Sequence, residues 1–183
     1  NFAIENMLGE AVNIKKMELV GNPFGDEVFE AMDKADAVIF GGGGVIHSCS
    51  GGNSRKNREQ TGTMWNMPLE RIEKLSSKII LYSVGFNKFD GEPAPLDRMG
   101  MFFELLNKKG ALVSFRNDGS KERFLDYFPD FSGIKVTPDP GIFARGAKRE
   151  VVQNYAILQI ATDRLEYRYP EGIDKFIDIV NQL

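Results

Sequence analysis

Arg116 is the side chain in this sequence best suited to bind a ligand. It directly follows the apolar run at residues 111–115, which is typical of a buried strand. A guanidinium fixed at the end of a rigid strand can hold a phosphate or a carboxylate through two parallel hydrogen bonds. We therefore predict an anion site at this point and assign the catalytic role to Arg116.

Two polar residues shortly after Arg116 allow two interpretations each. Asp118 could contact the ligand, or it could cap the following helix or pair with an arginine. Ser120 could donate a hydrogen bond to the ligand or cap the same helix. We include both as predicted substrate-binding residues and leave the capping alternatives open.

A run of four glycines follows another apolar stretch, at residues 37–40. These are Gly41, Gly42, Gly43 and Gly44. Because glycines lose much backbone entropy on ordering, the run indicates positive φ angles or a ligand pressed against the main chain. Its amide groups could bind an anion, or the run could be a tight turn without a ligand. The glycine spacing fits neither a dinucleotide fingerprint nor a P-loop.

Asp139 and His47 complete the predicted substrate-binding residues. Asp139 is held between Pro138 and Pro140, so its backbone has little freedom. It could bind a ligand or accept backbone hydrogen bonds that tie the chain to the sheet. His47 follows the glycine run and could face the same site, although an ordinary loop histidine is the alternative. Together with Cys49 it does not have the ligand spacing of a zinc site, and we predict no metal.

The elements that position these residues alternate between strands and helices. Apolar runs at residues 37–40, 78–85, 111–115 and 134–136 predict strands, and residues 65–75, 96–109 and 120–128 predict helices between them. This alternation predicts an α/β fold with a Rossmann-like, doubly wound parallel sheet. We expect this domain over residues 1–145, a linker over 146–154, and the start of a second, incomplete α/β domain over 155–183, with a helix from residue 173.

Composition limits the possible partners and location. The chain has 183 residues, of which 42% are hydrophobic and 27% charged, and its net charge is −3. A global basic field for nucleic acid is therefore excluded, and we expect neither a nucleic-acid partner nor a membrane span. The single cysteine and the lack of a targeting signal predict a cytoplasmic protein. Because the sequence begins at Asn1 without a methionine, we interpret it as a piece of a longer protein.

Four motifs in order resemble the polysaccharide pyruvyl transferase family. They are Ala-Asp-x-x-Ile-Phe-Gly-Gly-Gly-Gly at 35–44, Leu-Tyr-Ser-Val-Gly-Phe at 81–86, Ser-Phe-Arg-Asn-Asp-Gly-Ser at 114–120 and Pro-Asp-Pro-Gly at 138–141. The family usually has Arg-Asp where this chain has Arg116, Asn117 and Asp118, which changes the position of the carboxylate. The resemblance covers most of residues 35–145.

This resemblance implies two Rossmann-like domains arranged as in glycosyltransferase-B enzymes. It implies transfer of pyruvate from phosphoenolpyruvate, without a further cofactor, to two hydroxyls of a cell-surface polysaccharide or its precursor, forming a ketal. It also implies that a larger C-terminal part supplies a histidine and further basic residues. The alternatives are a sugar-nucleotide glycosyltransferase of the same architecture, and a non-catalytic binding module if the natural chain is this short.

Overall fold

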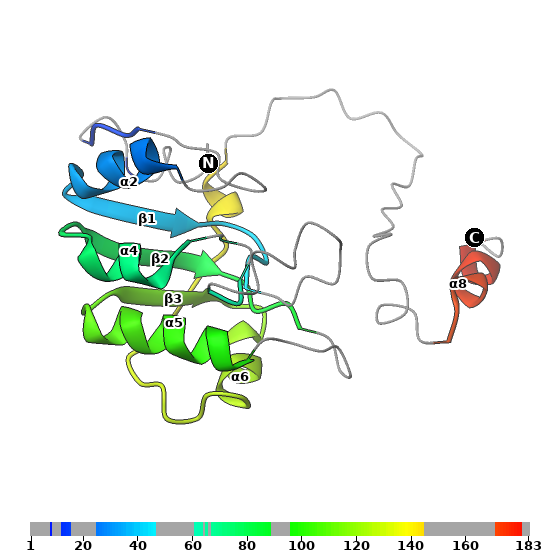
Figure 1. Cartoon of the computed structure of the whole chain (residues 1–183). Coiled ribbons are helices and arrows are strands. Elements are labelled where there is room, and N and C mark those ends of the chain that lie inside the picture. Colours follow the sequence, from blue (N-terminus) through cyan, green and yellow to red (C-terminus); the bar gives the residue numbers. More distant parts are fainter. Residues whose placement is uncertain are drawn as a thin grey trace, which may run out of the picture. The chain divides into compact units, whose positions relative to one another are not determined.

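The computed structural model divides the chain into two compact units. One comprises Asn1–Lys88 and Pro93–Arg145, and the other comprises Phe89–Glu92 and Gly146–Leu183. The structure describes residues 8, 12–15, 25–46, 61–63, 65, 67–88, 96–144 and 171–180. The first unit contains the described sheet (Figure 1).

The first unit is built on a four-stranded parallel sheet. Its strands are β1 (Ala37–Gly41), β2 (Lys78–Val84), β3 (Leu112–Arg116) and β4 (Lys135–Thr137), in the order β1-β2-β3-β4. The predicted α/β fold class with a parallel, Rossmann-like sheet is thereby confirmed. Because the strands are parallel, their carboxyl ends lie at one edge of the sheet, where ligands bind in such folds. Arg116 pairs with Thr137 at this edge.

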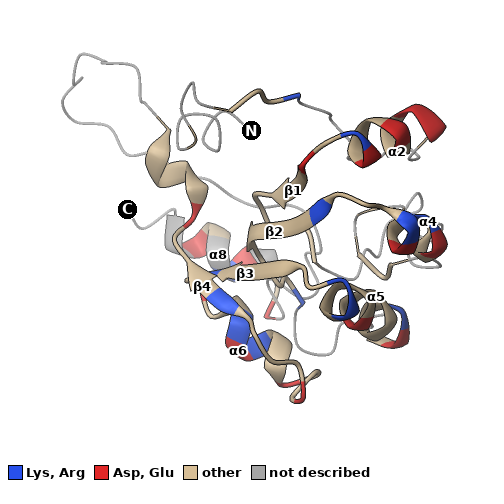
Figure 2. Cartoon of the chain, turned by 90° about the vertical axis from the view of Figure 1, so that its left-hand side faces the viewer, with Lys and Arg blue, Asp and Glu red and all other residues tan. Residues whose placement is uncertain are grey.

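Helices precede and connect the strands. α2 (Asp26–Asp33) comes before β1. The helices between successive strands are α4 (Leu69–Lys74), α5 (Leu96–Lys108) and α6 (Ser120–Leu125), and the 3₁₀-helix η2 (Pro140–Phe143) follows β4. Figure 2 looks along the strands and places α2, α4 and α5 on the same side of the sheet. Right-handed connections produce this arrangement when each new strand is added on the same side of the last one.

The core between the sheet and these helices is rich in aromatic side chains. Phe124 of α6 contacts five phenylalanines with ring centroids 4.6–5.8 Å apart: Phe86, Phe103, Phe115, Phe128 and Phe131. Trp65 packs against Phe40 of β1 and Phe102 of α5. The contacts of Phe124 fix α6 against the ends of β2 and β3.

Two helix predictions are wrong at one end. The helix predicted over residues 65–75 begins at Leu69, because Pro68 precedes it in extended conformation (φ −61°, ψ 127°). A proline ring disfavours helical backbone at the residue before it and is itself tolerated at a helix start. The helix predicted over residues 120–128 ends at Leu125.

The second unit contributes one described helix, α8 (Ile173–Val180), where the sequence predicts a helix from residue 173. The strand on which the second predicted domain depends, within residues 155–161, lies outside the described residues. The predicted domain division therefore stays a prediction. In the part of the chain that the structure describes, no helix is long and apolar enough to cross a membrane.

Candidate functional site

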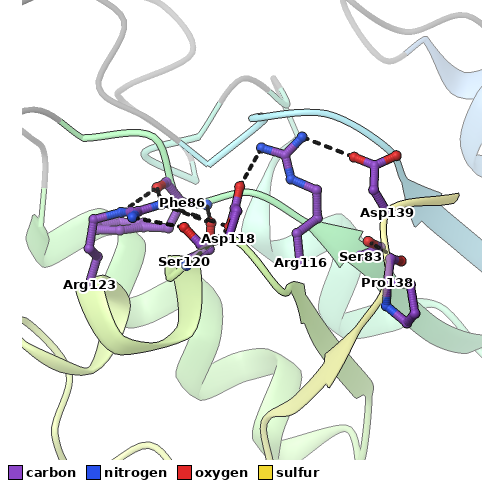
Figure 3. A network of polar contacts seen from close by, with 8 residues as sticks. All are labelled: Ser83, Phe86, Arg116, Asp118, Ser120, Arg123, Pro138 and Asp139. Atoms are coloured by element: carbon purple, nitrogen blue, oxygen red, sulfur yellow. Dashed lines mark hydrogen bonds and ion pairs between the residues drawn. The ribbon is translucent and has the colours of Figure 1, made fainter. Parts of the chain in front are cut away.

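Arg116 ends β3 with its guanidinium between two carboxylates (Figure 3). Its Nη2 lies 2.8 Å from Oδ2 of Asp118, and its Nη1 lies 3.2 Å from Oδ2 of Asp139. The Arg116 side chain is 24% exposed, so it is partly shielded from water and still reachable. Its Nε is buried and has no hydrogen-bond partner among the described residues. One N–H group on each terminal nitrogen is not used by these ion pairs.

Asp118 joins Arg116 to a second arginine. Its Oδ1 accepts a hydrogen bond from the backbone N of Ser120 (3.1 Å) and lies 3.8 Å from Nη2 of Arg123. Burial alone would raise the pKa of Asp118, but hydrogen bonds from Ser120 and the charges of Arg116 and Arg123 outweigh burial and hold this pKa below its usual value. Asp118 is therefore a carboxylate at neutral pH.

Ser120 is directed toward the protein. It is fully buried, and its Oγ accepts hydrogen bonds from the backbone N of Phe86 (2.9 Å) and from Nη2 of Arg123 (3.3 Å). Arg123 also donates to the carbonyl O of Phe86 and to that of Asp118. Ser120 is the first residue of α6, after Gly119 at φ 80°. These bonds attach the segment after β2 to the start of α6.

Asp139 combines a structural role with its ion pair. Its Oδ1 accepts a hydrogen bond from the backbone N of Gly141 (2.7 Å) and caps η2. Its Oδ2 is the atom that faces Arg116. The same carboxylate thus fixes the turn after β4 and orients the guanidinium.

Ser83 fixes this turn from the neighbouring strand. Its Oγ donates to the carbonyl O of Pro138 (2.9 Å), and its backbone N donates to Oγ of Ser114 (3.0 Å). Ser83 has a φ of 51°, and the register between β2 and β3 shifts between Leu81 and Val84. Left-handed backbone at a residue other than glycine costs energy and often occurs near functional sites. The irregularity of β2 therefore lies at the residue that is hydrogen-bonded to the turn before Asp139.

The glycine run lies beside the end of β2. Gly42 and Gly43 have φ angles of 78° and 88°, as the predicted need for positive φ requires. Gly43 accepts a hydrogen bond from the backbone N of Gly85 (2.9 Å), and Ile46 donates to the carbonyl O of Gly85 (3.1 Å). The run therefore continues the parallel pairing of β1 and β2 beyond the sheet.

The model of the polysaccharide pyruvyl transferase family matches residues 6–182. The chain belongs to the polysaccharide pyruvyl transferase family. No curated protein and no solved structure matches the chain.

In this family member the structure brings together part of the predicted site. Arg116, Asp118 and Asp139 are in direct contact, and Ser120 contacts Asp118. Gly44 of the glycine run and the guanidinium of Arg116 both lie beside Gly85. Gly41 lies in β1, and His47 lies outside the described residues. Among the residues that can be placed, no group of three or more His, Cys, Asp or Glu side chains could hold a metal ion.

Sequence reasoning missed two residues of this candidate site, Arg123 and Gly85. Arg123 follows Ser120 by three residues, a spacing that places two helical side chains on one face. Gly85 follows the apolar run of β2. The sequence of that run does not show which distant residue lies beside Gly85 in the fold. A surface hollow of about 590 Å³ between α4 and α5 is lined by none of the predicted site residues.

Proposed function

We propose that this protein transfers a pyruvyl group from phosphoenolpyruvate to two hydroxyls of a cell-surface polysaccharide or its precursor, forming a cyclic ketal. Pyruvyl transfer is the activity for which its family is named. The donor, the acceptor and the ketal are the parts that this proposal adds.

The observation that supports the donor most directly is the placement of Arg116. Its guanidinium lies at the carboxyl edge of a parallel sheet, with its plane held by Asp118 on one side and Asp139 on the other. The N–H groups of Nη1 and Nη2 that take no part in these two ion pairs suit a phosphate or carboxylate oxygen. An arginine held in this way need not be reordered when the anion binds, which lowers the entropic cost of binding.

Charges at the site nearly cancel, which determines how an anion would be bound. Arg116 and Arg123 face Asp118 and Asp139, so affinity must arise from directed N–H groups more than from a net positive field. The backbone of the glycine run is a second source of such groups. Phosphoenolpyruvate carries both a phosphate and a carboxylate, so it could use both sources at once.

The chemistry divides between donor and acceptor. A proton adds to the methylene carbon of phosphoenolpyruvate while positive charge develops at C2. The two sugar hydroxyls form bonds to C2 and lose their protons, and the bond from C2 to the phosphate oxygen breaks, releasing phosphate. In this scheme Arg116 binds the donor and stabilises the charge that moves onto the leaving phosphate. We assign the general acid to no described residue.

The remaining parts of the proposal concern organisation. We propose that residues 1–145 form one domain, that a second α/β domain begins near residue 155, and that the reaction needs no cofactor besides the donor. The single cysteine supports a cytoplasmic location, where phosphoenolpyruvate is made.

Product analysis tests the function. The full chain is incubated with phosphoenolpyruvate and a panel of glycans, and with activated sugars as the rival donors. We expect phosphate release that depends on a glycan, and its loss in Arg116→Ala with the protein still folded. Nucleotide release from an activated sugar, without consumption of phosphoenolpyruvate, would instead identify a glycosyltransferase. Neither reaction, with phosphoenolpyruvate still bound, would indicate a binding module.

A further inference from the structure

We propose that Gly85 is a positioning residue for Arg116, and that it is glycine because the guanidinium occupies the space of a side chain. A methyl carbon placed on Gly85 would lie 2.5 Å from Nη2 of Arg116 and 3.0 Å from its Cζ. Real side chains essentially never approach so closely. The guanidinium therefore lies directly against the main chain at the end of β2.

Backbone conformation does not require glycine at this position. Gly42 and Gly43 adopt positive φ angles that favour glycine, whereas Gly85 does not. An alanine could adopt the Gly85 backbone without strain. What excludes a side chain is the presence of Arg116.

The main chain of Gly85 cannot easily move away from a new side chain. Its N donates to the carbonyl O of Gly43 (2.9 Å), and its O accepts from the N of Ile46 (3.1 Å). The added carbon would also lie 3.1 Å from Cα of Gly44, which is backbone. The flexible end of Arg116 is thus the part that must move.

This movement would break the geometry of the site. Nη2, the atom closest to the added carbon, is also the atom that pairs with Asp118 at 2.8 Å. Displacing it pulls the guanidinium out of the plane that both aspartates define. Gly85 thereby determines where Arg116 can present the N–H groups that take no part in its two ion pairs, without contacting a ligand itself.

The first test needs no ligand. The Nε–H group of Arg116 is buried, so its resonance in a two-dimensional ¹⁵N spectrum of the full chain can be identified by its loss in Arg116→Lys. We expect Gly85→Ala to shift or broaden this resonance, with a melting temperature close to that of the wild type. The matched control is Gly100→Ala in α5, where a methyl carbon makes an ordinary 3.5 Å contact with Phe128. An unmoved Arg116 resonance in folded Gly85→Ala would overturn the proposal.

The second test rests on the proposed function and uses phosphoenolpyruvate and inorganic phosphate as probes in calorimetry. Gly85→Ala should weaken phosphoenolpyruvate binding about tenfold, a loss comparable to one charge-assisted hydrogen bond. In an Arg116→Ala background it should have no further effect, because the clash is gone. An equal loss in both backgrounds would contradict positioning through Arg116. If Arg116→Ala leaves affinity unchanged, the proposed function fails, while the spectrum still decides the role of Gly85.

Discussion

Oδ2 of Asp139 lies 3.2 Å from Nη1 of Arg116, although Asp139 follows β4 and Arg116 ends β3. The pairing of Arg116 with Thr137 sets this distance, because it aligns the ends of the two strands. Oδ1 of the same carboxylate caps η2. The orientation of the guanidinium is therefore determined by strand register and by the turn after β4, more than by the conformation of Arg116 alone.

Arg116→Lys should separate charge from geometry. A lysine keeps the positive charge but cannot pair with two carboxylates and an anion in one plane. We expect phosphoenolpyruvate to bind about tenfold more weakly, because about one charge-assisted hydrogen bond is lost. Calorimetry of the full chain measures this, and affinity equal to the wild type would mean that only the charge matters.

Asp118→Asn should reduce stability in a pH-dependent way. The pKa of Asp118 is held below its usual value in the folded protein. The stability that its carboxylate contributes is therefore present above the unfolded pKa, about 4, and is lost as pH falls through the folded pKa. The difference in unfolding free energy between wild type and variant should be largest near pH 7 and should shrink below about pH 4. Urea denaturation at a series of pH values measures it.

Asp33→Asn provides the control for Asp118. Its carboxylate accepts hydrogen bonds from the backbone N (2.8 Å) and Oγ (2.7 Å) of Ser76, which lower the pKa of Asp33. The difference in unfolding free energy between wild type and Asp33→Asn should therefore also shrink as pH falls. Affinity for phosphoenolpyruvate should fall in Asp118→Asn and stay unchanged in Asp33→Asn. Equal affinities in the two variants would count against a role for Asp118 in the site.

At Ser83 we expect the glycine variant to be more stable than the alanine variant, which is the reverse of the usual order in a strand. Both Ser83→Ala and Ser83→Gly lose the hydrogen bond to Pro138, but only glycine relieves the left-handed backbone at φ 51°. Left-handed backbone costs about 1–2 kcal/mol for an ordinary residue. We expect the glycine variant to be more stable than the alanine variant by about 1 kcal/mol in urea denaturation.

Ser114, in β3, is the matched control for Ser83 because it does not have a positive φ. There the order should be the usual one, with Ser114→Gly less stable than Ser114→Ala. If alanine were the more stable substitution at both positions, the left-handed conformation of Ser83 would carry no strain.

Phe124→Ala should strongly destabilise the first unit. Phe124 is fully buried and contacts five other phenylalanine rings, so its removal leaves a cavity that the helix cannot close. Such substitutions cost about 3–5 kcal/mol. Ile142→Ala, at a side chain that is 65% exposed, should change the unfolding free energy by less than about 0.5 kcal/mol. Chemical denaturation of both variants measures the contrast.

The sequence by itself determined the parallel sheet and the edge of the sheet at which Arg116 lies. Apolar runs ended by glycine or by Arg116 predict the strands, because burial on both faces of a parallel sheet demands continuous apolar residues. The edge at which Arg116 lies follows from the strand direction. The family resemblance rested on the same local runs, and the family match agrees with it.

Only the tertiary structure decided how the site is held together. Ser120 could cap a helix or donate to a ligand by sequence, and its Oγ instead accepts from Phe86, 34 residues earlier. Likewise, Gly85 is a glycine because of Arg116, which lies on another strand. Local propensity does not record which distant atom occupies the space beside a residue. These contacts depend on strand register and packing, which exist only once the chain has folded.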